Sequence, residues 1–583
     1  MSRISIAIVA LGAVVLASCS SAARDVTAVE ANVLIGSENS PVEPDVELDS
    51  GTLAWAPCAD VGSALVDIEC TTLMVPLDHE LPDGELIEIA LARVPTADRG
   101  TRIGSLVFNP GGPGGSGIDF LANAALLVPD EVASRFDLVS FDPRGVGMST
   151  AVECDDDLDD QVPLLASGDD EGWADLVADA NGFTETCTVE TIELAAHVGT
   201  NNAARDLDLI RDALGDEELS YVGFSYGTRL GATYAELFPD NVRALVLDGG
   251  VKPTNDLGEL DGEQGAGFDD ALESFANACD SDDDCVLGDL GPALDVYTGL
   301  VDEIAAAGSF KTDDVDRVLT PGELQLGVAA ALYSKQMWPV LADALYLADN
   351  DSDGTLLQAL VDSYAGRDPD GSYSNSQVAN GFISCADDPQ RLPVDEVRAE
   401  VDAAASQSVY FDDFLRASTS CIGVSSAVDP LIIGPADGAP AILVVGNTGD
   451  PATPYEWSVE LADSLTSGVL YMVEAEGHTA YLSIPCAESV VNSYLVDLEV
   501  PAVGASCSDN DGTDFFPPSG ESEIDALVAL FDCLRDNGAD VPEFSIADLI
   551  ADPSGELLLE ALDPSDPNFL DALLECEDLL GEL

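Results

Sequence analysis

The sequence predicts an α/β fold with a mostly parallel central sheet, helices on both faces and one large helical insertion. From about Leu53 onward, short apolar runs rich in Val, Leu and Ile alternate with helical stretches, and a Gly/Pro/Asp loop follows each run. Buried strands of a parallel sheet with helical crossovers have this pattern. In contrast, the 188 residues from 252 to 439 are mostly helical in pattern and separate two late apolar runs.

The predicted strands are the most apolar of these short runs. They cover residues 103–108, 136–141, 220–224, 244–248, 441–446 and 469–473. The core of the fold would therefore comprise residues 51–251 and 440–508. The inserted block, residues 252–439, enters between two late strands, which suggests a lid over an active site. The alternative is a separate inserted domain without a catalytic role.

The N-terminus resembles an export signal. Arg3 precedes a run of apolar residues that is too short to span a bilayer but suits the core of a signal peptide. The run ends in LASC, which resembles a bacterial lipobox, so residues 1–19 are interpreted as a lipoprotein signal peptide with Cys19 lipidated. An ordinary cleaved signal is the alternative. Residues 20–50 are polar and without periodicity, as expected of a flexible tether.

The charge is extremely acidic. Against 110 Asp and Glu the chain has 20 Lys and Arg, a net charge of −90. Such a surface repels nucleic acid and anionic lipid, and no basic patch interrupts it. We therefore expect no nucleic-acid partner, and membrane contact only through the lipid anchor. Few lysines among so many carboxylates also suggest a saline habitat, because salt screens the repulsion.

The cysteine count agrees with export. Twelve cysteines remain when Cys19 is set aside, and an even number in an exported chain predicts disulfides. Neighbours along the chain form six natural pairs, although the sequence leaves the connectivity open. The twelve are Cys58, Cys70, Cys154, Cys187, Cys279, Cys285, Cys385, Cys421, Cys486, Cys507, Cys533 and Cys576.

Neither a metal nor a cofactor is expected. The chain has three histidines and neither paired CxxC motifs nor an HExxH motif, so the sequence does not predict a zinc site. Residues 349–354, DNDSDG, match the first half of a calcium loop, but Leu360 occupies its twelfth position where a bidentate glutamate is needed. We interpret this segment as an acidic turn between helices.

The C-terminal part is interpreted as a linker, residues 509–522, and a small helical tail, residues 523–583. A tail of this size needs a staple, which Cys533 and Cys576 would provide. No chemistry is assigned to it.

A candidate nucleophile lies in GFSYGT, residues 223–228, directly after a predicted strand and before a helical stretch. In α/β hydrolases the nucleophilic serine occupies a sharp strand-to-helix turn, where glycines on both sides avoid clashes. Ser225 would occupy that position, with the helix N-terminus favouring developing negative charge. Because short Gly-x-Ser-x-Gly matches also arise by chance, a small residue in a tight turn is the alternative.

A serine nucleophile needs a base, and the base needs an orienting carboxylate, in the chain order Ser, Asp or Glu, His. His478 is the one histidine after Ser225 and follows a predicted strand. Asp450, in GNTGDPATP, follows another strand and is the preferred acid; Asp248, at the end of an earlier strand, is the rival. The other two histidines, His79 and His197, are expected to be surface or structural residues.

An oxyanion hole is expected from two backbone amides. The first is the N–H of Tyr226, directly after the nucleophile. The second would come from the glycine-rich loop NPGGPGGSG, residues 109–117, and we predict Gly112. A phosphate-binding loop is the alternative, but the Gly-Lys-Ser/Thr ending is missing. Arg144, in a second glycine-rich connection, is expected to pair with nearby carboxylates.

Together these segments resemble the secreted tripeptidyl aminopeptidases, relatives of prolyl aminopeptidase among the α/β-hydrolase serine peptidases. The similar stretches are NPGGPGGSG, FDPRGVGMS, GFSYGTRLGATYAELFPDNVRALVLDGGV, FISCADDP, GNTGDPATPYEWS, EGHTAY and YLVDLEVPAVGASC, in that order over residues 53–508. The resemblance implies the α/β-hydrolase fold, the triad Ser225, Asp450 and His478, and an oxyanion hole of Gly112 and Tyr226. It also implies the disulfides Cys486–Cys507 and Cys385–Cys421.

The expected function is an exported, cell-envelope or secreted serine peptidase, monomeric, acting near the N-termini of peptide substrates. Such an enzyme must bind the free amine of its substrate, most naturally with carboxylates near the lid, and Asp387 is one candidate. The region around Cys421 lacks the tryptophan common in the family, which puts the lid-side specificity in doubt. The alternatives are an esterase or lipase with the same triad and a non-catalytic binding protein on a hydrolase scaffold.

Overall fold

The computed structural model describes residues 53–58, 61, 66–154, 170–314, 317–368, 371–415 and 421–509, and a few positions beyond them (516, 531, 533–535 and 541). The predicted signal peptide with Cys19, the tether and nearly all of the linker and tail lie outside these residues. In the described ranges, no helix is long and apolar enough to cross a bilayer.

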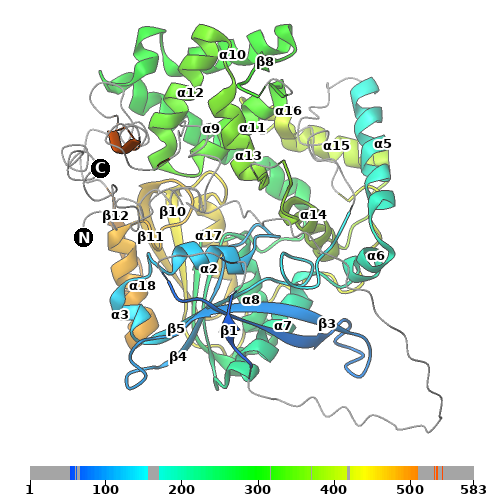
Figure 1. Cartoon of the computed structure of the whole chain (residues 1–583), viewed down its shortest axis with the longest axis vertical. Coiled ribbons are helices and arrows are strands. Elements are labelled where there is room, and N and C mark those ends of the chain that lie inside the picture. Colours follow the sequence, from blue (N-terminus) through cyan, green and yellow to red (C-terminus); the bar gives the residue numbers. More distant parts are fainter. Residues whose placement is uncertain are drawn as a thin grey trace.

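A ten-stranded sheet forms the centre of the molecule (Figure 1), in the order β1-β2-β3-β5-β4-β6-β7-β10-β11-β12. The strands are β1 (Ala56–Pro57), β2 (Glu69–Pro76), β3 (Leu86–Val94), β4 (Gly104–Asn109), β5 (Phe136–Phe141), β6 (Leu219–Phe224), β7 (Val242–Asp248), β10 (Ile442–Gly449), β11 (Gly468–Glu476) and β12 (Ser506–Ser508). From β5 to β12 all neighbours are parallel, whereas β1, β2 and β3 add antiparallel strands at one edge.

All six predicted strands are present in this sheet. Every residue of β4, β5 and β6 is buried, which explains why these strands are continuous apolar runs instead of alternating ones. The predicted α/β fold is therefore confirmed.

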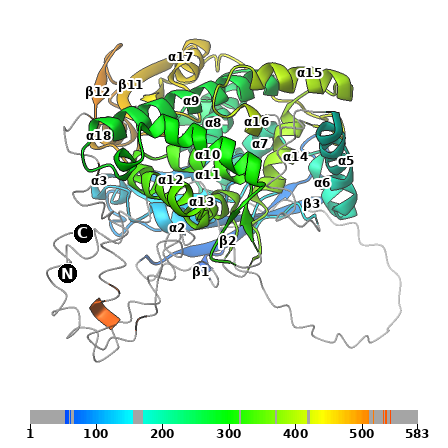
Figure 2. The ribbon, with the colours of Figure 1, turned by 90° about the horizontal axis from the view of Figure 1, so that it is seen from above.

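Helices cover both faces of the sheet. One face packs against α7 (Thr200–Leu214), α8 (Tyr226–Leu237) and α17 (Tyr455–Ser464), in a core that includes Leu207, Leu230 and Leu461. The other packs against α2 (Gly117–Ala124), α3 (Asp130–Ala133) and α18 (Pro485–Asp497). Two further helices, α5 (Asp170–Thr186) and α6 (Val189–Ala195), lie on the side of the molecule that carries α14 (Ser376–Asp387) and α15 (Val394–Ala405), away from α3 and α18 (Figures 1 and 2).

The inserted block, residues 252–439, is helical and has a hydrophobic core of its own, which includes Phe275, Leu300 and Leu341. Its helices are α9 (Leu257–Ser281), α10 (Ala293–Ala307), α11 (Pro321–Leu332), α12 (Trp338–Asp351), α13 (Thr355–Ala365), α14 (Ser376–Asp387), α15 (Val394–Ala405) and α16 (Asp412–Leu415), with a two-stranded ribbon of β8 (Phe310–Lys311) and β9 (Val318–Leu319). The block lies over one end of the sheet (Figure 1).

Among the described residues, five disulfides join cysteines that are neighbours in sequence. They are Cys58–Cys70, Cys154–Cys187, Cys279–Cys285, Cys385–Cys421 and Cys486–Cys507. The pairing expected from sequence order is therefore present for ten cysteines. The sixth predicted pair involves Cys576, which lies outside the described residues.

Candidate active site

Ser225 lies at the turn between β6 and α8 in a strained backbone conformation. Its φ of 54° and ψ of −124° are rare for a residue other than glycine. A Cβ at Gly223 would overlap the carbonyl oxygen of Gly227, so the turn cannot close without a glycine there. The Ser225 N–H donates to the Asp248 carbonyl oxygen at 2.9 Å, which links the turn to the neighbouring strand β7. The turn therefore has the geometry of a nucleophile elbow.

His478 and Asp450 are paired. The Nδ1 atom of His478 is 2.9 Å from both carboxylate oxygens of Asp450. Because an ionised carboxylate can only accept, Nδ1 must donate, which leaves Nε2 as the acceptor that a serine proton would need. Burial opposes protonation of His478, but the charge and hydrogen bond of Asp450 and the charge of Asp248 outweigh it and raise the imidazole pKa above its ordinary value.

Asp450 is itself held in place by the chain that follows it. Its Oδ1 accepts from the N–H groups of Ala452 (3.0 Å) and Thr453 (2.8 Å), and its Oδ2 accepts from the Thr453 hydroxyl (2.9 Å). The residue is 4% exposed. A carboxylate with this many donors is fixed in orientation and can position the imidazole.

Asp248, the rival acid, has another role. It is fully buried and accepts from the backbone N–H groups of Ala480 (3.0 Å) and Tyr481 (2.7 Å). Burial raises the pKa of its carboxyl group to about 7, although those hydrogen bonds oppose the shift. Asp248 therefore braces the loop that carries His478, whereas Asp450 contacts the imidazole.

The serine turn and the imidazole share a neighbour. The carbonyl of Asp248 accepts from Ser225, and a Cβ on the next residue, Gly249, would lie 3.2 Å from Cε1 of His478. Because φ at Gly249 is +67°, this glycine is also favoured conformationally. Two consecutive residues at the end of β7 therefore bring the candidate nucleophile and base to the same place.

The glycine-rich loop packs directly on the serine turn. Gly111, with φ +102°, is so close that a Cβ would lie 2.9 Å from Ser225 Cβ and 3.1 Å from the Tyr226 nitrogen. Its own N–H donates to Oδ1 of Asn109 at 3.2 Å. The next amide in the loop belongs to Gly112, the predicted second oxyanion donor, whose φ is +107°. Asn109 was not singled out from the sequence. Its side chain holds the start of this loop through the hydrogen bond from Gly111.

The inserted block contacts the candidate catalytic loops. The N–H of His478 donates to the carbonyl oxygen of Tyr333 at 2.8 Å, and the two rings meet edge to face at 5.3 Å. A Cβ at Gly114 in the glycine-rich loop would overlap the carbonyl oxygen of Ser376, at the start of α14. These contacts favour the lid interpretation over a separate domain.

Other residues singled out from the sequence prove structural. Arg144 is fully buried; its guanidinium binds both carboxylate oxygens of Asp206 at 2.7 Å, and His79 contacts the same aspartate at 2.8 Å. The expectation that Asp387 binds a substrate amine is not supported. It is 2% exposed, and both its oxygens accept from Thr200, at 2.7 and 2.5 Å.

The acidic segment 349–354, interpreted from the sequence as a turn between helices, is one only in its second half, because residues 349–351 form the last turn of α12. Helix α12 ends at Asp351 and α13 begins at Thr355, with Ser352 in the left-handed region between them.

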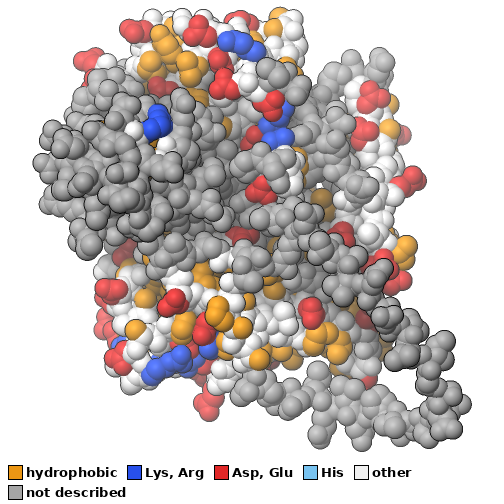
Figure 3. Space-filling view, viewed as in Figure 1, with side chains coloured by type: hydrophobic (Ala, Val, Ile, Leu, Met, Phe, Trp, Pro, Cys, Tyr) orange, Lys and Arg blue, Asp and Glu red, His pale blue; other side chains and the backbone are white. Residues whose placement is uncertain are grey.

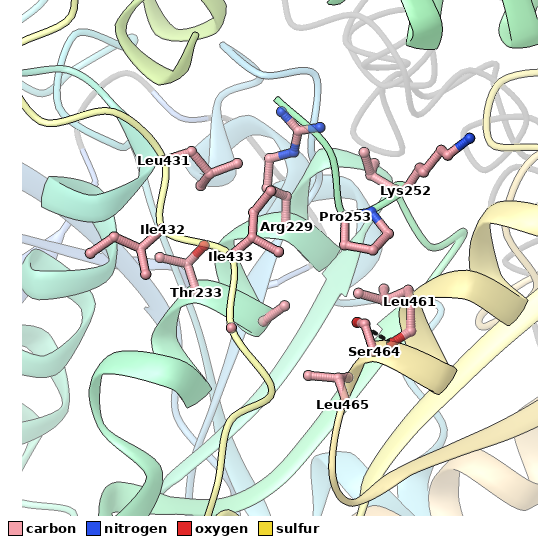
Figure 4. Close-up of a pocket in the computed structure, with 13 residues that line it drawn as sticks. Arg229, Thr233, Lys252, Pro253, Leu431, Ile432, Ile433, Leu461, Ser464 and Leu465 are labelled. Atoms are coloured by element: carbon pink, nitrogen blue, oxygen red, sulfur yellow. Dashed lines mark hydrogen bonds between the residues drawn. The ribbon is translucent and has the colours of Figure 1, made fainter. Parts of the chain in front are cut away.

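A pocket on the flank of the core does not include the candidate triad. It lies between α8, α17 and the segment 431–434, and its lining is mainly apolar, including Leu431, Ile433 and Leu461 (Figure 4). Arg229 and Lys252 border it. Because Ser225, Asp450 and His478 are not among its lining residues, we do not assign substrate binding to it.

Comparison with known proteins agrees with this geometry. The α/β hydrolase fold family model matches residues 104–483. The chain belongs to the α/β-hydrolase family. Serine protease Hip1 of Mycobacterium tuberculosis is 38% identical over 477 residues, covering 78% of this chain and 90% of that protein.

Two further relatives have different names. Carboxylesterase B of M. tuberculosis is 34% identical over 481 residues, with the same coverage of 78% and 90%. Tripeptidyl aminopeptidase of Streptomyces lividans is 30% identical over 479 residues, 78% of this chain and 86% of the relative. The resemblance to the tripeptidyl aminopeptidases is thus confirmed, and the α/β-hydrolase relatives have both peptidase and esterase names.

Proposed function

We propose that this protein is an exported serine peptidase that releases short peptides, such as tripeptides, from the N-termini of its substrates. The observation that carries the proposal is the pairing of His478 with the buried Asp450 beside the strained Ser225 turn. A strained serine and an oriented imidazole are costly arrangements that a merely structural turn does not need. They also argue against a non-catalytic binding protein.

The proposed reaction proceeds through an acyl-enzyme. Ser225 Oγ attacks the scissile carbonyl carbon while its proton passes to Nε2 of His478, and the N–H groups of Tyr226 and Gly112 stabilise the resulting oxyanion. His478 then gives that proton to the leaving amine as the C–N bond breaks. Water, deprotonated by His478, attacks the acyl-enzyme and releases the N-terminal fragment with a free carboxylate. His478 gives the proton from water to the departing Ser225 Oγ, which restores both residues. Asp450 holds the imidazole throughout.

Recognition of a free amine would require carboxylates between the core and the inserted block. Asp119, in the first turn of α2 just after the glycine-rich loop, is the candidate we propose, together with Asp368 of the inserted block, whose charge acts on Asp119. Burial raises the pKa of Asp119 to about 7, and the charges of Asp142 and Asp368 add to this effect. An ammonium group placed between these carboxylates would offset their mutual repulsion.

An esterase with the same triad is the second candidate, favoured by the similarity to a protein named Carboxylesterase B. The same nucleophile and oxyanion hole would cleave esters, so the triad alone does not separate the two functions. The distinguishing property is the need for a free amine.

The first experiment is labelling with a fluorophosphonate, which reacts with activated serines. Wild-type protein should be labelled, Ser225→Ala should not, and His478→Ala should be labelled at least a hundredfold more slowly. Ser489→Ala, at an exposed position on α18, is the matched control and should be labelled like the wild type. Absence of wild-type labelling would contradict the proposed enzyme.

The second experiment compares peptides with free and acetylated N-termini. A peptidase of the proposed kind should lose at least about tenfold in kcat/KM on acetylation, a typical loss for one missing charged contact. Asp119→Asn and Asp368→Asn should reduce turnover of the free peptides, whereas Asp130→Asn, in the first turn of the neighbouring helix α3, should not. Equal turnover of blocked and free peptides, with faster ester cleavage, would favour the esterase.

A further inference from the structure

A buried chain of hydrogen bonds joins the residue after Ser225 to the inserted block. The hydroxyl of Tyr226 is 2.6 Å from Oγ1 of Thr200, and Oγ1 of Thr200 is 2.5 Å from Oδ2 of Asp387. The Thr200 N–H also donates to Oδ1 of Asp387 at 2.7 Å. Tyr226 is 7% exposed, Thr200 is fully buried and Asp387 is 2% exposed, so water does not compete for these bonds.

The order of donors in this chain follows from chemistry. Burial raises the pKa of Asp387 to about 6, against the opposing influence of Arg229 and Thr200, so the carboxyl group is ionised at pH 8 and can only accept. The single hydroxyl proton of Thr200 must therefore go to Asp387, and Thr200 accepts from Tyr226. Burial also raises the pKa of the Tyr226 phenol above its ordinary value, so this donor keeps its proton.

Asp387 acts on a second residue of the same helix turn. Arg229, three positions after Tyr226 on α8, interacts electrostatically with Asp387 and donates to the carbonyl oxygen of Thr254 at 3.1 Å. Asp429 is the other charged group that affects the Asp387 carboxyl group. The guanidinium of Arg229 points away from the apolar side chains of the pocket it borders (Figure 4).

The chain of hydrogen bonds ends at Tyr226, whose N–H must be placed accurately in the proposed reaction. The Tyr226 N–H is the proposed oxyanion donor, and its side chain is the part of the residue that Thr200 and Asp387 hold. Asp387 is the last residue of α14, whose first residue, Ser376, touches Gly114 of the glycine-rich loop. Helix α14 thus contacts the glycine-rich loop directly and reaches Tyr226 through Thr200.

We propose that Asp387 and Thr200 are positioning residues for the reaction: they fix the ring of Tyr226, and with it the N–H that faces the oxyanion, so that the oxyanion hole is complete only when α14 is docked on the core. This inference rests on the proposed function. Oxyanion donors act only within a narrow distance range, and they act in the transition state and not in substrate binding. Loosening Tyr226 should therefore lower kcat and leave KM nearly unchanged.

The test compares Thr200→Val with Thr200→Ser at pH 8. Valine has the shape of threonine without the hydroxyl, whereas serine keeps the hydroxyl and both bonds to Asp387. We expect Thr200→Val to lose about tenfold in kcat, with KM within twofold of wild type, and Thr200→Ser to restore most of the activity. The affinity for a transition-state analogue, a peptide trifluoromethyl ketone, should fall by the same factor as kcat. Equal kcat values for the valine and serine variants would overturn the inference.

A second variant keeps the test valid if Thr200→Val does not fold. Tyr226→Phe removes one hydroxyl and by itself should reduce kcat without changing KM. Where Thr200→Val does fold, the double variant should lose no more than the worse single one, because both substitutions break the Tyr226–Thr200 bond. A loss seen only in KM, or additive losses, would also overturn the inference.

The failure of this inference can be told apart from that of the proposed function. If wild-type protein cleaves esters and not peptides, the same comparison is made with the ester, since acyl transfer from either needs the oxyanion hole. A wild type that cleaves neither refutes the proposed function, and the inference with it. An active wild type with an equally active Thr200→Val refutes the inference alone.

Discussion

Two buried aspartates, Asp450 and Asp248, lie near His478, and replacing them by asparagine should have very different effects on kcat: a large loss for Asp450→Asn and a small one for Asp248→Asn. In Asp450→Asn, the amide oxygen should take the position of Oδ1, because the N–H groups of Ala452 and Thr453 both need an acceptor there. The NH2 group then faces Nδ1 of His478 and favours the tautomer with the proton on Nε2. That tautomer cannot accept the proton of Ser225, so the base is lost although its position is kept.

The magnitude follows from this loss. When the acid of a serine-protease triad becomes an amide, kcat falls by about 10⁴ in the well-studied case, or about 5 kcal/mol of transition-state stabilisation. We expect a loss of about 10³ to 10⁴ for Asp450→Asn. Asp248→Asn can keep its amide oxygen toward the Ala480 and Tyr481 N–H groups, so its kcat should stay within about tenfold of wild type.

The assay is the steady-state hydrolysis of a chromogenic peptide or ester at pH 8, with the concentration of folded enzyme normalised by thermal unfolding. Ser225→Ala gives the background. A loss of 10³ or more in Asp248→Asn, with Asp450→Asn within tenfold of wild type, would refute the assignment of the acid and the tautomer argument with it.

Three further predictions follow from the same groups. The pKa of Asp248 in the folded protein, about 7, lies above its ordinary value of 3.8. The free energy of unfolding of the wild type should therefore fall relative to that of Asp248→Asn as the pH rises from about 4 to 7, as measured by denaturant unfolding. A difference in unfolding free energy that does not change with pH would contradict this. His478 must be neutral to act as the base, and its pKa is raised above 6.5, so kcat/KM should fall on acidification with an apparent pKa above 6.5. Removing the charge of Asp450 should move this acidic limb of the pH–rate profile to lower pH. Thr453→Val removes the hydroxyl bond to Asp450 and should lower kcat about tenfold, whereas Thr453→Ser should not; equal rates for the two variants would show that the hydroxyl is not needed.

The sequence predicted the parallel part of the sheet better than its edge. Five of the six expected strands are continuous apolar runs because nearly all their residues are buried, whereas the sixth, β11, is only half-buried. Strands β2 and β3 were not predicted: β2 is mostly half-exposed and carries polar residues such as Thr71, and β3 contains the exposed Glu88. A half-covered strand such as β2 resembles loop or amphipathic helix in a single sequence, whereas β3 is mostly buried and its apolar run is interrupted by Glu88.

Some residues of the candidate site could likewise be predicted from the sequence, and others could not. Ser225, Asp450 and His478 stand in short local motifs at strand ends, and each motif could be recognised without knowledge of the fold. Tyr333 and Thr200 could not be found in this way, because their roles come from contacts between distant segments; Thr200 and Asp387 are 187 residues apart. Thr453 did have a local signal, since its spacing of three from Asp450 suits a turn in which an aspartate accepts from the backbone that follows it.

The extreme acidity of the chain sets a condition on how its buried carboxylates are stabilised. Figure 3 shows acidic side chains scattered over the visible face, with few basic ones among them. With 20 Lys and Arg for 110 Asp and Glu, most carboxylates have no cation to pair with.

Buried carboxylates around the candidate site are instead held largely by backbone N–H groups and hydroxyls. Asp142 accepts from Ser116, Ile118 and Met148. Asp248 accepts from the loop that carries His478, and Asp450 accepts from the residues that follow it in the chain. Hydrogen bonds of this kind are short-ranged and protected from solvent, so salt should weaken them far less than surface ion pairs. Salt does screen the repulsion among the surface carboxylates. Raising NaCl from about 0.05 to 1 M, which shortens the Debye length to about 3 Å, should therefore increase the melting temperature and leave kcat nearly unchanged. A melting temperature that falls with salt would mean that surface ion pairs, and not these backbone bonds, dominate the stability.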